Sequence, residues 1–286
     1  MNLDHSISKR ITDPTLRILS LGAGVQSSVL ALLASRGELG DVPNAAVFAD
    51  TKWEQPAVYE HLDWLETQLS FPIYRVTAGN ILDHIGIATD PEAQEHFASI
   101  PWYVAGTAWN GSVGMGRRQC TREFKIDPIR KKVRELLGLK PRQHAQGVLV
   151  EMWIGISTDE IQRLKESQFS YMRNRWPLIE IGWNRGRCIS WFNREYPGRK
   201  LVKSSCIGCP YRKSAQWARM KIDDPDSFAE AVRVDRMLRA NGAARGISRL
   251  QYMHRSCTPL GEIDFSEWTR QMEFGFLEEC QGICGL

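Results

Sequence analysis

The feature that most constrains the fold is an alternation of short apolar runs with helical segments near the N-terminus. Residues 17–21 form an apolar run, and a loop rich in glycine and serine leads from it into an apolar segment compatible with a helix. Residues 45–49 form a second run, residues 56–69 carry apolar side chains at helical spacing, and residues 71–76 form a third run. This alternation favours βαβ units and a mostly parallel sheet, with binding loops at the carboxyl ends of its strands.

The remainder of the chain continues the pattern less regularly. Residues 126–137 predict a basic helix, residues 148–156 predict another buried strand, and residues 158–165 resemble a capped helix start. Two later helices are predicted at residues 189–196 and 226–240.

Residues 80–116 break the pattern, because glycine and aromatic residues are frequent there and no clean period survives. We expect a mobile loop over a site. A chain of 286 residues is long enough for one α/β domain with an appendage. We therefore expect an α/β fold with a mainly parallel five-stranded sheet and helices on both faces. The expected divisions are an N-terminal arm (1–15), the α/β domain (16–200) and a smaller cysteine-containing C-terminal region (201–286) packed on it.

The composition excludes several other classes. Hydrophobic residues make up 43% of the chain and charged residues 24%, which is ordinary globular usage and argues against disorder, a collagen-like repeat or a coiled-coil rod. No apolar run reaches the length of a membrane helix, and the N-terminus lacks the apolar stretch of a signal peptide. We therefore expect a cytoplasmic protein.

The net charge of +4 is too small to indicate nucleic-acid binding by itself. The distribution of charge is more informative, because basic side chains outnumber acidic ones between residues 117 and 134. The basic residues of this segment are Arg117, Arg118, Arg122, Lys125, Arg130, Lys131, Lys132 and Arg134. The segment either faces phosphate groups or is a solvated helix face.

The chain has seven cysteines, an odd number, and a disulfide framework is not expected in a reducing compartment. Cys206 and Cys209 form a CxxC motif, and Cys280 and Cys284 lie close together near the C-terminus. Reactive thiols and metal ligands are the two alternatives for these pairs. Cys188 stands alone in a partly apolar helical context, so we expect it to be packed in the core.

The glycine loop after the first predicted strand points to an anion site. A strand that ends in such a loop and feeds a helix gathers free backbone N–H groups and the positive end of the helix dipole at one point, where phosphate is the natural ligand. The loop lacks the lysine of a Walker motif and does not follow the GxGxxG pattern. A tight strand-to-helix connection without a ligand is the alternative interpretation.

Residues 20–30 (SLGAGVQSSVL) resemble the pyrophosphate loop (PP-loop) of the adenine-nucleotide α-hydrolase superfamily, whose usual form is SxSGGxDS. Gly24 and Ser27 fall on positions of that motif. Gly22 replaces a serine, Ala23 replaces a glycine, and Gln26 replaces the usual aspartate.

Further segments extend the resemblance along the chain from about residue 16. Residues 48–54 (FADTKWE) look like a segment of the phosphoadenylyl-sulfate (PAPS) reductase branch, and residues 119–130 are similar to a segment of sulfonucleotide reductases. Residues 155–165, 177–180 and 204–211 resemble a phage and bacterial PAPS reductase-like group related to the ATP pyrophosphatase of DNA phosphorothioation.

This resemblance implies an adenine nucleotide as ligand and a set of residues that hold it. Asp50, at the end of the second predicted strand, is then expected to contact ribose or adenine, the alternative being a helix cap. Asp159 is a candidate for catalysis or Mg²⁺ binding, and first-turn helix residues are the alternative for it and Glu160. The implied nucleotide contacts are Ser20, Gly22, Ala23, Gly24, Gln26, Ser27, Ser28, Asp50, Thr51, Gly155, Arg163 and Lys165.

The resemblance also implies a [4Fe–4S] cluster, for which three ligands carry over: Cys120, Cys206 and Cys209. The fourth is missing: either Cys280, Cys284 or Cys257 supplies it, with Cys280 our choice, or the fourth iron stays open and binds a sulfur donor. Structural zinc and metal-free thiols are the alternatives. The C-terminal pair, Cys280 and Cys284, has some likeness to the tail that carries the catalytic cysteine of PAPS and adenylylsulfate (APS) reductases, so either residue is also a candidate nucleophile.

Three functions follow from the resemblance. The first is an enzyme that uses ATP and Mg²⁺ to adenylate an acceptor, such as tRNA or DNA, releases pyrophosphate and then transfers sulfur from a donor. The second is a PAPS or APS reductase that releases sulfite with a thioredoxin-like reductant. The third is a nucleotide-sensing protein without catalysis. No membrane partner is expected.

Overall fold

The computed structural model describes residues 13–83, 100–106, 113–240 and 249–273. By its internal contacts the chain divides into two compact units, each assembled from separate segments. Unit 1 comprises residues 1–50, 56–77 and 126–204, and unit 2 comprises residues 51–55, 78–125 and 205–286. The sequence-based boundaries at residues 15 and 200 stay predictions, and the observed division is discontinuous where contiguous regions were expected.

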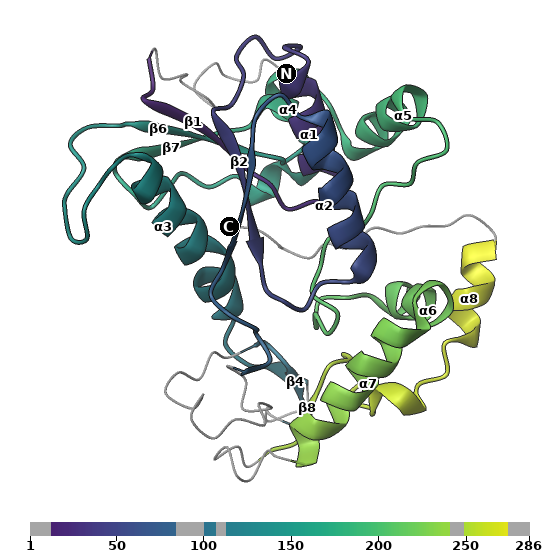
Figure 1. Cartoon of the computed structure of the whole chain (residues 1–286). Helices are drawn as coiled ribbons and strands as arrows, with labels where there is room; N and C mark the ends of the chain where they lie inside the picture. The colour runs from purple at the N-terminus through teal and green to yellow at the C-terminus, as the bar shows by residue number, and fades with distance from the viewer. Residues whose placement is uncertain (1–12, 84–99, 107–112, 241–248, 274–286) are drawn as a thin grey trace. The chain divides into compact units, whose positions relative to one another are not determined.

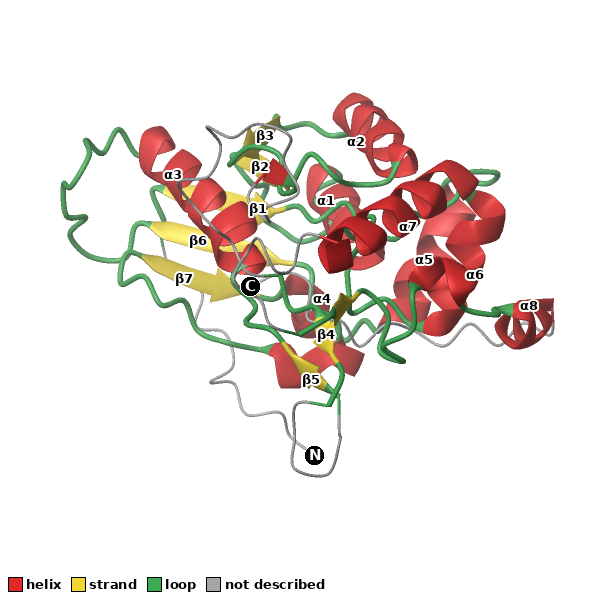
Figure 2. Cartoon of the chain, turned by 90° about the horizontal axis from the view of Figure 1, so that it is seen from below, coloured by secondary structure: helices red, strands yellow, loops and turns green. Residues whose placement is uncertain are grey.

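Unit 1 is built on a parallel sheet. Within the described residues its strands are β1 (Leu16–Ser20), β2 (Ala45–Asp50), β3 (Ile73–Thr77), β6 (Val150–Ile154) and β7 (Met172–Arg175). Their order across the sheet is β3-β2-β1-β6-β7, and every neighbouring pair is parallel. Figure 2 shows β1, β6 and β7 side by side and pointing the same way. The expected α/β class with a five-stranded parallel sheet is confirmed.

Helices lie on both faces of this sheet (Figure 1). The helices of unit 1 are α1 (Val25–Ser35), α2 (Pro56–Gln68), α3 (Asp127–Leu136), α4 (Pro177–Glu180) and α5 (Arg185–Glu195), with a 3₁₀ helix at Thr158–Arg163. A π-helical turn at Arg122–Ile126 precedes α3. One apolar cluster joins α1, α2, α4 and α5 to the sheet, whereas α3 contacts β2 and β3.

The core of unit 1 explains why these elements form. Strand β2 is buried at every position, as expected of an apolar run covered on both faces. Helix α1 is buried from Val25 to Ala34, so its apolar side chains contact protein all round. Each fully buried leucine, such as Leu30, contributes about 1.5–3 kcal/mol from burial alone. The two elements flanking the glycine loop are therefore firmly anchored.

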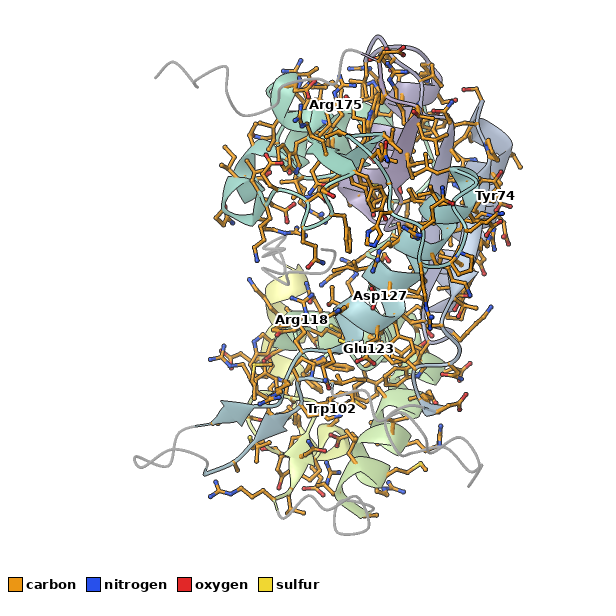
Figure 3. The ribbon with its side chains drawn as sticks, turned by 90° about the vertical axis from the view of Figure 1, so that its left-hand side faces the viewer. Tyr74, Trp102, Arg118, Glu123, Asp127 and Arg175 are labelled. Atoms are coloured by element: carbon orange, nitrogen blue, oxygen red, sulfur yellow. The ribbon has the colours of Figure 1, made fainter. Side chains whose placement is uncertain are left out.

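Unit 2 contains a small sheet and a helical layer. Its described strands are β4 (Tyr103–Val104), β5 (Gly114–Met115) and β8 (Gln251–Tyr252), arranged β5-β4-β8 and antiparallel. Its helices are α6 (Ser214–Asp223), α7 (Pro225–Ala240), a short 3₁₀ helix (Leu260–Glu262) and α8 (Ser266–Glu273). A separate apolar cluster that includes Trp102, labelled in Figure 3, and Trp217 forms its core.

Two sequence predictions need correction here, and one strand was not predicted. Residues 158–165 were expected to start an α-helix, but the segment is a 3₁₀ helix interrupted at Glu160, whose backbone is non-helical. The helix predicted at residues 189–196 begins earlier, because Asn184 caps it by accepting a hydrogen bond from the backbone N–H of Arg187 at 2.8 Å. Strand β7 was not singled out, since its sequence is polar.

In the described parts of the chain, no helix is both long enough and apolar enough to cross a membrane. The predicted loop at residues 80–116 falls partly outside the described residues, as do Cys280 and Cys284.

Candidate functional site

The order of strands in unit 1 locates a binding position. The chain moves outward in one direction from β1 through β2 to β3, and then returns to place β6 on the other side of β1. In open parallel sheets, ligands bind outside the carboxyl ends of the strands at this reversal point. Ser20 and Ile154 are paired at the ends of β1 and β6, so the segments that follow them meet at one point. These segments are the glycine loop and residues 155–163.

The glycine loop has the backbone that its sequence predicts, although one residue is unexpected. Ala23 is buried and has a φ of 54°, a left-handed conformation that favours the glycine usual at this position of the PP-loop motif. The Gly24 N–H donates to Ser27 Oγ at 3.2 Å, which fixes the first turn of α1. Gly22 is exposed and Gly24 partly so. A helix N-terminus that follows an open glycine backbone provides N–H donors for an anion.

Gly155 lies directly against this loop. A Cβ atom added to Gly155 would come within 2.8 Å of both the Cα and the backbone N of Ser27, and within 3.1 Å of the carbonyl carbon of Gln26. These are backbone atoms in the first turn of α1, which cannot move aside as a flexible side chain would. Glycine at position 155 is therefore required for the segments after β1 and β6 to approach each other.

Gln26 connects the glycine loop to two further segments of unit 1. Its Nε2 donates to Glu160 Oε2 at 2.9 Å and to Ser157 Oγ at 3.3 Å. Its Oε1 accepts a hydrogen bond from Arg185 Nη1 at 2.9 Å. Gln26 is only 8% exposed, so both ends of its amide are held by protein.

The acidic residues after β6 belong to the same network. Asp159 Oδ1 accepts from the hydroxyl of Ser157 at 2.5 Å and from the backbone N–H of Arg185 at 3.2 Å. Glu160 pairs with Arg163. Lys165 is exposed, and its carbonyl oxygen accepts from Asn174 Nδ2 at 2.8 Å. Asp159 and Glu160 were expected either to handle the ligand or to stabilise a helix start, and the structure shows them bonded to side chains and to the start of α5.

A buried polar contact joins the first turn of α1 to α2. Ser28 Oγ lies 2.9 Å from Nε2 of His61 on α2, and both residues are buried. His61 packs against the rings of Trp64 and Phe192. Burial, and secondarily the charge of Arg199, lowers the pKa of His61 from 6.5 to about 4. The imidazole is therefore neutral at physiological pH and joins α1 to α2 as an uncharged partner of Ser28.

Asp50 is the last residue of β2, as the sequence predicted. It is 4% exposed, and its Oδ1 accepts from the Tyr59 hydroxyl at 2.9 Å. Thr51, the next residue, belongs to unit 2. The chain thus passes from the end of a central strand of unit 1 directly into unit 2, and it does so again between Ser204 and Ser205. Ser204 lies beside Gly24, within 4 Å of where a Cβ on that glycine would stand.

Unit 2 contains a pocket lined by three cysteines. Its cavity volume is about 40 Å³. The cationic side chains of Arg118, which is labelled in Figure 3, and Lys125 also line it. Arg118 stacks on Tyr211 with 5.1 Å between guanidinium carbon and ring centroid. The full lining is Thr51, Ile81, Pro101, Arg118, Cys120, Thr121, Lys125, Cys206, Cys209, Pro210 and Tyr211. The fold therefore places Cys120, Cys206 and Cys209 around one cavity. These are the three cysteines that the resemblance implied as ligands of one cluster.

Cys206 has close polar neighbours within unit 2. Its Sγ lies 3.3 Å from Thr51 Oγ1 and 3.6 Å from Glu54 Oε1, and Lys125 Nζ is 4.0 Å from the same carboxylate oxygen. Burial, and next the carboxylate of Glu54, raises the pKa of the Cys206 thiol, while Lys125 and the hydrogen bond from Thr51 oppose that rise. Cys206 is thus a protonated thiol at neutral pH, and it must lose a proton before it binds a metal or attacks a substrate.

The CxxC turn that carries Cys206 and Cys209 is held rigidly. The N–H of Cys209 donates to the carbonyl of Cys206 at 3.1 Å, which closes the turn. A Cβ on Gly208 would lie 2.2 Å from the ring of Trp53 and 2.8 Å from Met253, so this position has no space for a side chain. Arg212 donates to Ser205 Oγ at 2.9 Å and to the Cys206 carbonyl at 3.2 Å.

The donor chemistry limits which metal group the pocket fits. All five described cysteines are free thiols, and within the described residues no three His, Cys, Asp or Glu side chains form a group that could hold a metal ion. Structural zinc, one of the alternatives, would need its ligands to converge on one ion. An iron–sulfur cluster differs, because each cysteine binds a separate iron and the thiolates surround the group rather than converge on one ion. Cys280, the expected fourth ligand, lies outside the described residues.

Two other expectations can be compared with the structure. Cys188 is fully buried, as predicted, and burial raises its pKa to about 12. In the basic segment, Arg130 stacks on Phe169 and Lys132 on Tyr74, so part of the positive charge contacts protein. Lys131 is exposed.

No family model matches the chain, and no curated protein is a detectable relative. Among solved structures, the chain is similar to phosphoadenylyl-sulfate reductase from Candida auris in its phosphate complex, with 15% identity, coverage of 68% of this chain and 76% of that one, and a TM-score of 0.39. It is also similar to the U34-tRNA thiolase NcsA from Methanococcus maripaludis with its [4Fe-4S] cluster, with 13% identity, coverage of 96% and 87%, and a TM-score of 0.36. Because both TM-scores lie below 0.5, we assign no activity from either likeness.

Proposed function

We propose that this chain is an enzyme of nucleotide-dependent sulfur chemistry, in which unit 1 binds an adenylyl nucleotide and unit 2 supplies thiols. The observation that carries the proposal is the reversal of strand order between β1 and β6, which brings the Ser20–Ser28 loop against Gly155. Ligands of open parallel sheets bind at this position, and phosphate is the ligand that a glycine loop before a helix prefers.

Unit 1 would hold the nucleotide by its phosphates. The backbone N–H groups of the glycine loop and the first turn of α1 would stabilise the charge on the phosphate oxygens, including charge that develops during reaction. Asp50, at the carboxyl end of the neighbouring strand β2, would contact the nucleoside. The proposed ligand is ATP or a sulfonucleotide such as PAPS or APS, which share the adenylyl group.

Unit 2 would supply the sulfur chemistry through its cysteine pocket. Cys120, Cys206 and Cys209 line one cavity together with two cationic side chains. A [4Fe–4S] cluster held there by these three cysteines would have one iron able to bind the sulfur of a donor, whereas Cys280 as a fourth ligand would close that position. Cys206 and Cys209 follow closely after Ser204, which lies beside Gly24 of the glycine loop. Thr51, which follows Asp50 directly, lies 3.3 Å from Cys206 Sγ through its hydroxyl, and these connections along the chain support a shared function.

One reaction that uses these parts is adenylation followed by sulfur transfer. An acceptor oxygen attacks the α-phosphorus of ATP, the bond to the β-phosphate breaks, and pyrophosphate leaves. A sulfur nucleophile from a donor then displaces AMP from the acceptor. The acceptor would be tRNA or DNA, which the exposed Lys131 and its basic segment could bind.

The second reaction is reduction of a sulfonucleotide, and the cations beside the thiols favour it. Arg118 and Lys125 line the same cavity as the cysteines, and such groups bind oxyanions such as a sulfonate. A cysteine thiolate would attack the sulfur of PAPS or APS and release the nucleotide, leaving an S-sulfonated cysteine. A thioredoxin-like dithiol would then supply two electrons and release sulfite. Cys280 or Cys284 is the proposed nucleophile.

The products distinguish these reactions. We expect purified protein to bind an adenylyl nucleotide and to release either pyrophosphate and AMP from ATP with a nucleic-acid acceptor, or sulfite from PAPS or APS with a dithiol. Cys206→Ala should abolish turnover, whereas Cys257→Ala, a cysteine that does not line the pocket, should retain it. Nucleotide binding without turnover that is indifferent to Cys206→Ala would instead support the nucleotide-sensing alternative.

Metal analysis tests the cluster separately. Anaerobically purified protein should contain about four irons and four sulfides per chain, and these should be lost in Cys206→Ala and kept in Cys257→Ala. Absence of iron from all of these samples would remove the cluster from the proposal.

A further inference from the structure

We propose that unit 1 carries a binding surface for single-stranded RNA on α5 and on the segment that follows this helix. The inference goes beyond the proposed function, because the surface uses neither the residues of the glycine loop nor the cysteines. It is also distinct from the basic segment at residues 117–134. The observation that carries it is a row of aromatic rings covered by arginine side chains.

Four aromatic rings follow one another in this part of unit 1. The ring centroids of Trp183 and Trp191 lie 6.2 Å apart, and Trp191 lies 6.2 Å from Tyr196. Tyr196 in turn lies 5.1 Å from Trp64 of α2. Trp191 is buried, whereas the other three rings are partly exposed. We call these four residues the aromatic row, and both of its ends reach solvent.

An arginine covers the ring at each end of the aromatic row. The guanidinium carbon of Arg187 lies 5.0 Å from the ring centroid of Trp183, and that of Arg199 lies 4.2 Å from the ring centroid of Trp64. A cation–π contact positions a guanidinium without neutralising its charge. In the part of the chain that the structure describes, neither arginine forms an ion pair with a carboxylate. Both charges can therefore act on an anion.

The middle of the aromatic row carries a third arginine, which shares one carboxylate with a fourth. Arg36 lies 5.0 Å from the ring centroid of Trp191 and 5.3 Å from that of Tyr196. Glu195 accepts from Arg36 Nη1 at 2.8 Å and from Arg194 Nε at 2.9 Å. One negative charge thus faces two guanidinium groups, so this part of the surface keeps an excess of positive charge.

The sequence around α5 has the same excess. Between residues 183 and 203 the chain has six basic residues and a single acid, Glu195. Asp159 also lies at the start of α5, where it accepts from the backbone N–H of Arg185. The excess of cations over acids is therefore retained when this neighbour is counted. Clusters of Lys and Arg on one face are the electrostatic signature of binding to a phosphate backbone.

The exposed side of α5 combines this charge with neutral hydrogen-bonding groups. Arg187, Ser190, Asn193 and Arg194 are all exposed, and residues three, four and seven positions apart share one side of a helix. A serine hydroxyl and an asparagine amide can each exchange hydrogen bonds with a ribose 2′-hydroxyl, the group that distinguishes RNA from DNA.

The covered rings favour a single strand over a duplex. A guanidinium that lies over an aromatic ring leaves its other face for an unpaired base, since both groups are planar. The bases of a duplex are stacked on one another and cannot occupy that position. Positive charge, stacked arginines and polar groups that suit ribose therefore point to single-stranded RNA as the occupant.

Fluorescence anisotropy of the full-length protein with a labelled, unstructured RNA oligonucleotide tests the inference. We expect binding in EDTA without any nucleotide, and we expect it to weaken as salt is added. The same sequence as an RNA duplex should bind about 10-fold more weakly, because stacking of bases on the arginines is lost. The same sequence as single-stranded DNA should also bind more weakly than the RNA.

Two substitutions of Arg187 separate stacking from charge. Arg187→Ala should weaken RNA binding by about 10-fold or more. Arg187→Lys keeps the charge and loses the planar group, so it should weaken binding while the dependence of affinity on salt stays as in the wild type. A residue that only supported the fold would not produce this difference. Thermal unfolding of each variant checks that it is folded.

A third variant tests the contact with phosphate, and a fourth is the control. Lys200 is exposed, and Lys200→Ala should lower the slope of log affinity against log salt concentration by about 0.7, the value for one phosphate contact of a single strand. Arg75 is an exposed arginine of unit 1 that pairs with Asp63 and Glu66. Arg75→Ala removes the same charge elsewhere and should bind RNA as the wild type does.

Each other outcome overturns a stated part of the inference. RNA binding that is unchanged in the variants of Arg187 and Lys200 would overturn the assignment to this surface, and its loss in Lys131→Ala would then assign it to the basic segment. Equal affinity for the duplex would overturn the role of the rings, and equal affinity for single-stranded DNA would overturn the choice of RNA. No binding of RNA, with or without binding to phosphatidylserine vesicles, would overturn the inference as a whole. The nucleotide-binding proposal would remain intact, because titration with nucleotide tests it separately.

Discussion

The buried contact between Ser28 and His61 makes the stability of unit 1 depend on pH in a calculable way. The folded protein holds His61 neutral with a pKa of about 4, whereas the unfolded chain has the ordinary value of 6.5. Below pH 6.5 the unfolded chain therefore binds a proton that the folded protein does not. The contribution of His61 to stability is complete above pH 6.5 and is lost as the pH falls from 6.5 toward 4.

The size of the effect follows from the two pKa values. A difference from 6.5 to about 4, at 1.36 kcal/mol per pH unit, corresponds to about 3 kcal/mol of folding free energy. This is a large part of the 5–15 kcal/mol by which proteins of ordinary stability are folded. Protonation of His61 also places a charge beside Trp64, Phe192 and Arg199. It therefore disturbs the contact between His61 and Ser28, the residue that follows the glycine loop.

Urea unfolding between pH 7.5 and pH 4.5 of the wild type and of His61→Gln measures this contribution. Glutamine can still bond to Ser28 but does not titrate, so the difference between the two proteins removes the effect of other groups. The wild type should lose stability relative to His61→Gln by about 1.4 kcal/mol for each pH unit below about 6. A difference in unfolding free energy that stays constant over this range would refute the lowered pKa and the neutral imidazole.

Three substitutions or modifications test other contacts. Gly155→Ala should destabilise the fold by about 1–3 kcal/mol and weaken nucleotide binding, because its Cβ would lie 2.8 Å from backbone atoms of Ser27. Thermal unfolding measures the loss of stability and calorimetric titration the loss of binding. Wild-type values in both assays would contradict the close approach of Gly155 to Ser27. Gly208→Ala should destabilise the protein to a similar or greater extent, because its Cβ would lie 2.2 Å from the Trp53 ring. Calorimetric unfolding measures this loss, and an unaltered unfolding temperature would contradict the close packing of the turn. Cys188 should resist alkylation at pH 7.5 in the native protein and react after unfolding, because it is buried and its pKa is raised to about 12. Mass spectrometry detects the alkylated residue, and rapid labelling of the native protein would contradict its burial.

The sheet of unit 1 was largely predictable from sequence because its central strands are continuous apolar runs. Residues 45–50 are buried at every position, and such runs identify parallel strands directly. Strand β7 escaped prediction because it reads MRNR, with two arginines and an asparagine. Arg175 (Figure 3) is only 2% exposed there, paired with Glu180 at 2.9 Å and stacked on Trp153 at 4.4 Å. Arg175 also pairs at 3.5 Å with the buried Glu151 of β6, and a buried ion pair between two separate strands leaves no local pattern.

The candidate sites were predictable in their local motifs but not in their partners. The glycine loop, Asp50 and the CxxC motif can each be recognised from a short stretch of sequence. Arg185 reaches Gln26 across 159 positions of sequence, and no local signal marks it except the capping residue Asn184 just before it. Only the folded chain shows that the amide of Gln26 faces a guanidinium.

The most direct test of the central claim is hydrogen–deuterium exchange of the whole protein with and without a bound adenylyl nucleotide. The account predicts slower exchange on binding in peptides covering Ser20–Ser28 and Gly155–Arg163, since these segments meet where the order of strands reverses. A nucleotide that binds and leaves the exchange of both segments unchanged, while protecting another part of unit 1, would contradict it.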